Sequence, residues 1–196
     1  MNLREVEDTG FDQLVTKGKE IWNRELGKIE VEDTNIDNLR TFYSCLYRSL
    51  LFPRSFYEID AKGQVMHYSP YNGKVLPGYM FTDTGFWDTF RAACPLLSVL
   101  HPEVAEDYVK TLLEHYKYAG QLPIWTLWGI ENYQMTGIHS LPVITNAYLN
   151  GIIGFDTELA LKAMTESAMK DTCGYSMGYF VGLENYRKYG YVPCDM

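Results

Sequence analysis

The sequence predicts a mainly α-helical fold, with a short β-hairpin insertion near residues 55–80. Two observations lead to this prediction. Apolar side chains recur at helical spacing in six or seven segments, and only residues 55–80 combine alternation with closely spaced turn residues. Helices alternate with long loops and short turns, and no tetratricopeptide, ankyrin or HEAT repeat is present. This order favours a solenoid or toroid of helices over an α/β sheet.

The first half of the chain begins with a predicted helix over residues 11–26, which Gly27 ends. Asp37 opens the next helix, whose apolar stripe runs to Leu50 before Pro53 stops it. Residues 55–80 then contain three turns, at Lys62-Gly63, Tyr71-Asn72-Gly73-Lys74 and Pro77-Gly78. The closely spaced turns predict short antiparallel strands, and we expect strands nowhere else.

The second half returns to helical spacing. A helix is predicted over residues 86–100, with a kink or a late start at Pro95. Pro102 stands where a first-turn proline belongs, and residues 103–118 are clearly amphipathic. The remaining predicted segments are a loop over 124–138, a helix from Ser140 to Leu149, a helix from Thr157 to Lys170 capped by Thr157, a loop over 171–182 and a helix from Leu183 to Tyr189.

Composition excludes several classes of protein. The chain has 196 residues and a net charge of −8, and no basic run, which argues against nucleic acid as a partner. No stretch approaches the roughly 18–20 apolar residues of a membrane span.

The acidic start, Met1–Asp8, is unlike a signal peptide, and residues 189–196 resemble a turn into a further element, so we expect a piece of a longer protein. The four cysteines, Cys45, Cys94, Cys173 and Cys194, lack metal-site spacing and are interpreted as structural thiols, with Cys45 and Cys94 buried.

The first cluster that could carry chemistry is residues 82–91, which contains Trp87, Asp88 and Arg91. Asp88 and Arg91 are three residues apart, so they could simply form an ion pair on one helix face beside an N-cap. A tryptophan next to an aspartate also suits a sugar site, because the indole packs on the ring and the carboxylate accepts from hydroxyls.

The second cluster is residues 122–132, where Glu131 follows Trp125, Trp128 and Gly129. A carboxyl group among aromatic side chains has its ionised form disfavoured, so its pKa rises. A raised pKa is what a general acid needs at neutral pH. The alternative is a solvated loop glutamate with no catalytic role.

The third cluster is residues 135–144, in which His139 and Ser140 precede an apolar helix. No HExxH motif surrounds His139, and no Gly-x-Ser-x-Gly elbow surrounds Ser140. A structural residue at a helix start is the plainer interpretation of His139.

Taken in order, these motifs resemble family 92 of the glycoside hydrolases, the calcium-dependent exo-α-mannosidases. The resemblance covers nearly the whole chain. It rests on Thr41–Tyr47, Trp87–Arg91 with Pro95–Leu97, Gly120–Trp125, Gly129-x-Glu131, Gly137–Ser140 with Pro142–Ile144, Gly151-Ile152, Gly154–Asp156 and Tyr189–Pro193.

The resemblance implies a partial (α/α)6 toroid, with residues 1–196 as its N-terminal portion; the β-sandwich that precedes the toroid in the family and the toroid's C-terminal half would lie outside this chain. It implies Glu131 as the general acid and Trp87, Asp88 and His139 as substrate-binding residues. The general base and the calcium ligands are then expected beyond Met196. The chain alone should be inactive, and its uncovered helix faces should favour a homo-oligomer.

The implied activity is exo-acting removal of terminal mannose from glycans, with α-1,2-linked mannose as the substrate. The reaction would invert the anomeric centre and would be assisted by calcium. By the same resemblance the parent protein is secreted, periplasmic or at the cell surface. Ile130 and Asn132 replace the Asn and Thr that commonly flank the acid in the family, which bears on linkage preference. Two alternatives stay open: another (α/α)6 carbohydrate hydrolase, trehalase-like or glucosidase-like, and a non-catalytic carbohydrate-binding remnant.

Overall fold

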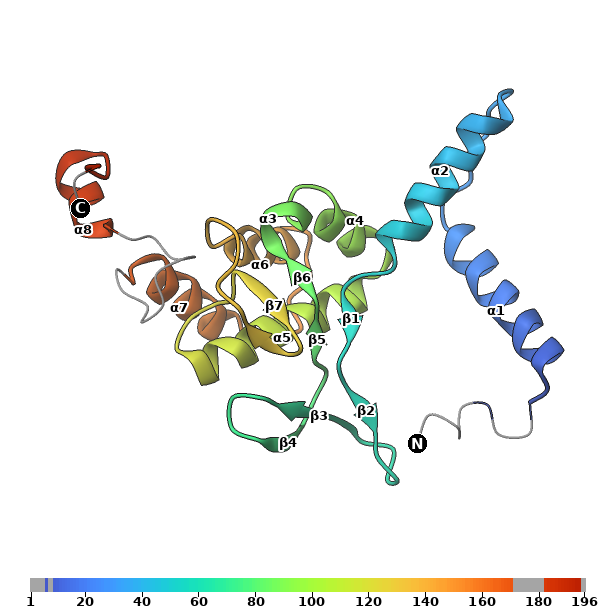
Figure 1. Cartoon of the computed structure of the whole chain (residues 1–196), viewed down its shortest axis with the longest axis horizontal. Coiled ribbons are helices and arrows are strands. Elements are labelled where there is room, and N and C mark those ends of the chain that lie inside the picture. The colour runs from blue at the N-terminus through green and yellow to red at the C-terminus, as the bar shows by residue number, and fades with distance from the viewer. Residues whose placement is uncertain (1–5, 7–8, 171–181, 195–196) are drawn as a thin grey trace. The chain divides into compact units, whose positions relative to one another are not determined.

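The computed structural model describes residue 6 and residues 9–170 and 182–194. The chain divides into two compact units, Met1–Leu51 and Phe52–Met196. Helices make up about half of the structure and the sheets are small, which confirms the mainly helical prediction. The elements are labelled along the chain in Figure 1.

The first unit is a pair of helices, α1 (Phe11–Leu26) and α2 (Ile36–Ser49). The rings of Trp22 and Tyr47 pack with centroids 4.5 Å apart, and the Tyr43 hydroxyl donates to the Ile29 carbonyl oxygen at 3.1 Å. The cap of α2 is Asn35 rather than Asp37, because the Asn35 side chain accepts from the Asp37 backbone N–H at 2.9 Å.

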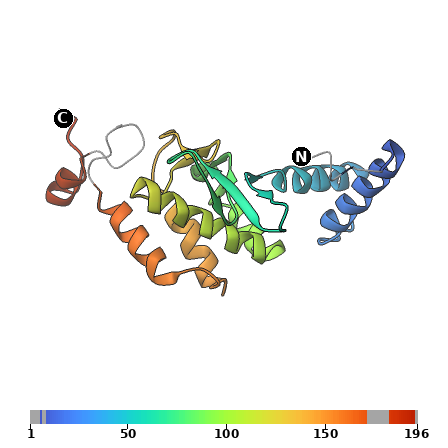
Figure 2. The same cartoon turned by 90° about the horizontal axis from the view of Figure 1, so that it is seen from below.

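The second unit is organised around one long helix, α5 (Pro102–Ala119), which contacts α4 (Ala93–Leu100), α6 (Ser140–Leu149) and α7 (Thr157–Ala168). Pro102 occupies its first turn, as the sequence predicts, and Gly120 ends it in the left-handed region at φ 70°. Figure 2 shows strands on one side of α5 and α7 on the other. Such a helix is buried on several faces, and its buried residues are Ala105, Tyr108, Val109, Thr111, Leu112, Leu113, His115 and Tyr116.

Three small antiparallel sheets complete the second unit. The predicted insertion contains a three-stranded meander of β2 (Glu58–Ile59), β3 (Val65–Ser69) and β4 (Lys74–Pro77), and β1 (Arg54–Ser55) pairs with β5 (Phe81–Thr82). The prediction of strands only near residues 55–80 was wrong. A third sheet joins β6 (Thr84–Gly85), β7 (Trp125–Leu127) and β8 (Ile130–Glu131), where a loop was expected. Strands of two or three residues are too short to show an alternating pattern.

Some helix boundaries also differ from prediction. The segment 86–100 forms two helices, α3 (Phe86–Thr89) and α4, and Pro95 is the third residue of α4, where its missing N–H costs no helical hydrogen bond. The cap of α7 is Asp156, whose carboxylate accepts from the Leu159 N–H at 2.9 Å, and Thr157 is the first helical residue. The last helix, α8 (Leu183–Tyr189), is as predicted, whereas the predicted loop over 171–182 lies almost wholly outside the described residues.

The cysteines are only partly placed as the sequence predicts. Cys94 is buried as expected, but Cys45 is exposed, as is Cys194, and Cys173 lies outside the described residues. Within the part of the chain that the structure describes, no helix is both long enough and apolar enough to cross a membrane.

Candidate functional site

The sheet β6–β7–β8 brings the first two sequence clusters together. Gly85 pairs with Trp125 across β6 and β7, and Thr126 pairs with Glu131 across β7 and β8. Residues some 40 positions apart in the sequence are therefore neighbours on one three-stranded ribbon. Because β6 leads directly into α3, the ribbon also places Asp88 near Trp125.

Gly85 is the point of closest approach between the two clusters. A Cβ atom built on Gly85 would lie 2.7 Å from Trp125 Cδ1 and 3.4 Å from Asp88 Oδ2. The Trp125 indole and the Asp88 carboxylate therefore both lie close to the backbone of Gly85. They fit there because Gly85 has no side chain.

Trp87 and Asp88 are exposed on the short helix α3. The ion pair between Asp88 and Arg91 that residue spacing suggests is not what the structure shows. Arg91 Nε donates to the Trp87 carbonyl oxygen at 3.2 Å, and its guanidinium carbon lies 5.0 Å from the Trp87 ring centroid. This cation–π contact orients the Trp87 indole and leaves the Asp88 carboxylate available.

The carboxyl group of Glu131 is buried, with 6% of the residue exposed. Its oxygens accept three backbone N–H groups: Oε2 accepts from Ile124, and Oε1 accepts from Trp125 at 3.2 Å and from Tyr133 at 2.7 Å. Burial raises the pKa of Glu131, and the backbone hydrogen bonds oppose that rise, with burial prevailing. The predicted raised pKa therefore has burial as its cause.

Tyr71 holds the backbone of the same residue from the other side. The Glu131 N–H donates to the Tyr71 hydroxyl at 3.0 Å, and that hydroxyl lies 3.0 Å from His115 Nδ1 on α5. Sequence reasoning missed both residues, because Tyr71 lies in a turn 60 positions before Glu131 and His115 lies within an ordinary amphipathic pattern. The one available signal was a histidine on the otherwise apolar face of α5.

The turn between β7 and β8 is strained. Trp128 has φ 55° and Gly129 has φ 75°, the conformation of a two-residue turn that favours Asn-Gly. Thr82 on β5 and the next residue, Asp83, hold the backbone amides of this turn. The Gly129 N–H donates to Thr82 Oγ1 at 2.7 Å, and the Trp128 N–H donates to Asp83 Oδ1 at 3.2 Å. The Trp128 side chain is held outward, 66% exposed, and offers a flat apolar face.

His139 joins the first cluster through stacking. Its ring lies 4.4 Å from the Phe90 ring, centroid to centroid, at an interplanar angle of 25°. His139 Nδ1 is buried and has no hydrogen-bond partner among the residues that the structure describes. His139 therefore lies beside the Trp87 helix, and no hydrogen bond within the described segments connects it with Glu131.

The described residues do not fit a metal site. Within 9–170 and 182–194, no group of three or more His, Cys, Asp or Glu side chains could hold a metal ion. Two acidic side chains of the site are already engaged, since Asp83 pairs with Arg54 at 3.2 Å and Glu131 is held by backbone amides, whereas Asp88 is available. No calcium site built from three or more such side chains is therefore formed within these segments.

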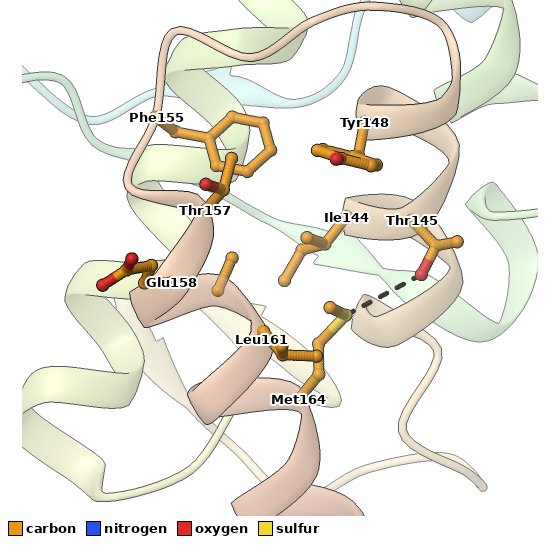
Figure 3. Close-up of a pocket in the computed structure, with 9 residues that line it drawn as sticks. Ile144, Thr145, Tyr148, Phe155, Thr157, Glu158, Leu161 and Met164 are labelled. Atoms are coloured by element: carbon orange, nitrogen blue, oxygen red, sulfur yellow. Dashed lines mark hydrogen bonds between the residues drawn. The ribbon is translucent and has the colours of Figure 1, made fainter.

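A separate groove lies between α6 and α7 (Figure 3), with a volume of about 360 Å³. None of Trp87, Asp88, Glu131 and His139 lines it. Its walls are mostly apolar and include Ile144, Tyr148, Phe155, Leu161 and Met164. With so few polar groups, the groove resembles a helix-packing surface more than a sugar site.

Comparisons with known proteins agree with the resemblance. The chain is similar to the family GH92 inverting mannosidase BT2199 from Bacteroides thetaiotaomicron VPI-5482, with 43% identity and a TM-score of 0.91, covering 97% of this chain and 26% of that one. It is also similar to the family GH92 α-mannosidase BT3965 from Bacteroides thetaiotaomicron, solved with mannoimidazole, with 30% identity and a TM-score of 0.83, covering 99% of this chain and 24% of that one.

A third relative is an uncharacterized secreted glycosidase of Arthroderma benhamiae, 23% identical over 188 residues that make up 94% of this chain and 20% of that protein. The chain thus spans about a quarter of the length of the solved mannosidases or less. Over residues 1–196 the sequence matches the catalytic domain of glycosyl hydrolase family 92, and the chain belongs to that family.

Proposed function

We propose that this chain is part of the catalytic domain of an exo-acting, inverting α-mannosidase, with Glu131 as its general acid. The observation that carries the proposal is the buried Glu131 carboxyl, whose pKa is raised by burial, on a ribbon that also carries Trp125 and leads to Asp88. The mannosidase titles of the similar structures support the choice of substrate.

A general acid must carry a proton that it can transfer to the substrate. A protonated carboxyl group has one O–H donor. Its proton would pass to the glycosidic oxygen as the bond between that oxygen and the anomeric carbon breaks. In an inverting enzyme, a water molecule attacks the opposite face and gives its proton to a base about 6.5–9.5 Å from the acid.

The other predicted residues are proposed as the wall of the mannose site. Trp87 and Asp88 are exposed side by side on α3, so an indole face and a free carboxylate are both accessible to a sugar. His139 is proposed to border the same wall, because its ring stacks on Phe90, two residues beyond Asp88.

The base and the calcium ion are proposed to be held by residues outside this chain. The described residues supply no calcium site, and the chain matches only 26% and 24% of the solved mannosidases. We interpret residues 1–196 as the N-terminal portion of an (α/α)6 toroid. The apolar groove of Figure 3 supports this interpretation, because further helices of a toroid would cover such a surface. The uncovered groove also supports self-association of the isolated chain.

The linkage preference is proposed from the sequence, and the location of the protein from the fungal relative. We retain α-1,2-linked mannose as the substrate, with the Ile130 and Asn132 neighbours of the acid as the positions that would alter this preference. Secretion is proposed because the fungal relative is a secreted glycosidase.

The test is Glu131→Gln in the full-length protein, with Glu58→Gln on the exposed strand β2 as the matched control. Hydrolysis of a mannobiose, whose leaving group is poor, should fall by about 10²–10⁴-fold. Hydrolysis of dinitrophenyl α-mannoside should fall far less, because that leaving group needs little protonation. A modest loss that is equal for both substrates would remove Glu131 from the mechanism. Chelation by EDTA should abolish activity reversibly if calcium takes part.

A further inference from the structure

We infer that Tyr71 and His115 are positioning residues for Glu131. The three residues form one relay of hydrogen-bonding groups, which runs from His115 on α5 through Tyr71, in the turn between β3 and β4, to strand β8. The inference rests on the proposed role of Glu131 as the acid.

The direction of each hydrogen bond near Tyr71 follows from what each group can do. The Glu131 backbone N–H can only donate, so the Tyr71 hydroxyl oxygen accepts from it at 3.0 Å. The hydroxyl hydrogen is then free to be donated to His115 Nδ1, also at 3.0 Å. Burial raises the pKa of Tyr71, and the hydrogen bond from the Glu131 backbone only partly opposes this rise, so the phenol keeps its hydrogen.

His115 must be neutral for this arrangement, with its hydrogen on Nε2. The residue is 1% exposed, and burial, followed by the charge of His67, lowers its pKa to about 4. His115 Nδ1 is therefore a bare acceptor at neutral pH, and His115 Nε2 carries the only ring hydrogen.

Strand β8 needs such an anchor because it is only two residues long. Its ladder to β7 fixes one edge of the strand, and the Glu131 side chain is fixed by the amides of neighbouring residues. The Tyr71 hydroxyl binds the Glu131 amide at the other edge, and so ties the ribbon to α5 through His115. Loss of this bond would let the carboxyl move relative to a bound glycosidic oxygen.

The decisive variant is Tyr71→Phe in the full-length protein, which keeps the ring that stacks on Tyr118 and removes only the hydroxyl group. Tyr68→Phe, on the exposed side of β3, is the matched control. For a mannobiose, kcat should fall about ten- to hundredfold with KM within about twofold, since a displacement of about 1 Å costs that much in rate. For dinitrophenyl α-mannoside the loss should be much smaller.

The double variant Tyr71→Phe/Glu131→Gln separates positioning from other roles. If Tyr71 acts through Glu131, the double variant should be no slower than Glu131→Gln alone. Additive losses, or equal losses on both substrates, would overturn the inference. A Glu131→Gln variant that shows no selective loss would instead overturn the proposed function, whatever Tyr71→Phe does.

Two further measurements test the relay itself. Amide hydrogen exchange of a peptide spanning 125–133 should accelerate in Tyr71→Phe but not in Tyr68→Phe, and unchanged exchange would contradict the anchor. His115→Gln keeps one acceptor and one donor, whereas His115→Leu keeps neither. A kcat per folded molecule that is higher in His115→Gln than in His115→Leu supports the relay. Equal kcat in the two variants counts against it.

Discussion

Gly85 offers a sharp test of the site geometry, through the change Gly85→Ala. The backbone of Gly85 has φ −87°, which any residue adopts, so the substitution adds a methyl group without backbone strain. That methyl carbon would lie 2.7 Å from Trp125 Cδ1. The change therefore acts on the contact between the two halves of the site and on little else.

The size of the effect follows from contact distances. Carbon atoms normally approach to about 3.5–4.0 Å, so the Trp125 indole must move by about 1 Å. Overpacking of this kind costs about 1–3 kcal/mol of folding free energy. A displacement of about 1 Å in a catalytic site lowers kcat/KM by up to about 10²-fold.

The assay is mannobiose hydrolysis by the full-length protein, with the thermal midpoint recorded in parallel. Gly18→Ala in α1 is the matched control, because nothing lies within 4 Å of a Cβ at Gly18. The control should keep full activity and gain some stability, since Ala favours a helix interior over Gly by about 0.8–1.0 kcal/mol. If Gly85→Ala keeps the wild-type kcat/KM, the contact between Gly85 and Trp125 has no part in the site.

Two more predictions concern stability. Thr82→Val should lower stability by about 1–3 kcal/mol, because the Gly129 N–H loses its acceptor, whereas Thr82→Ser should retain most of it; chemical denaturation monitored by tryptophan fluorescence compares them, and equal stabilities would refute the role of this bond. The pKa of His115 is lowered on folding from an ordinary 6.5 to about 4, so its stabilising effect is complete above about pH 6.5 and is lost as the pH falls toward 4. That loss is about 3 kcal/mol at most, and a denaturation series over this range should be flatter in His115→Gln; an unchanged slope would assign the effect to another group.

The long helices could be predicted because their ends carry local signals. Pro102 and Gly120 mark the two ends of α5 by backbone chemistry alone. The error at α7 shows the limit of this reasoning, since Asp156 and Thr157 are both competent caps. Only the extended backbone of Asp156, which aims its carboxylate at the Leu159 N–H, decides between them.

The candidate site could be predicted only in part. The aromatic neighbours of Glu131 predict a raised pKa, but the amides that hold its oxygens could not be predicted, because a backbone N–H is the same at every residue. The pairing of Gly85 with Trp125 depends on strands too short to have a pattern. Tyr71 meets Glu131, and His115 meets Tyr71, only through tertiary packing, which no local spacing encodes.

The turn at Trp128 bears on any effort to make this protein more resistant to heat. A tryptophan in the left-handed region costs about 1–2 kcal/mol, which Asn or Gly at the same position would largely recover. A procedure that ranks substitutions by folding free energy alone would therefore replace Trp128 early. It would also discard an indole that is 66% exposed three residues before Glu131. Libraries at this position should therefore be ranked by function as well as by melting temperature, because substitution to Asn or Gly gains stability and removes the exposed aromatic surface together.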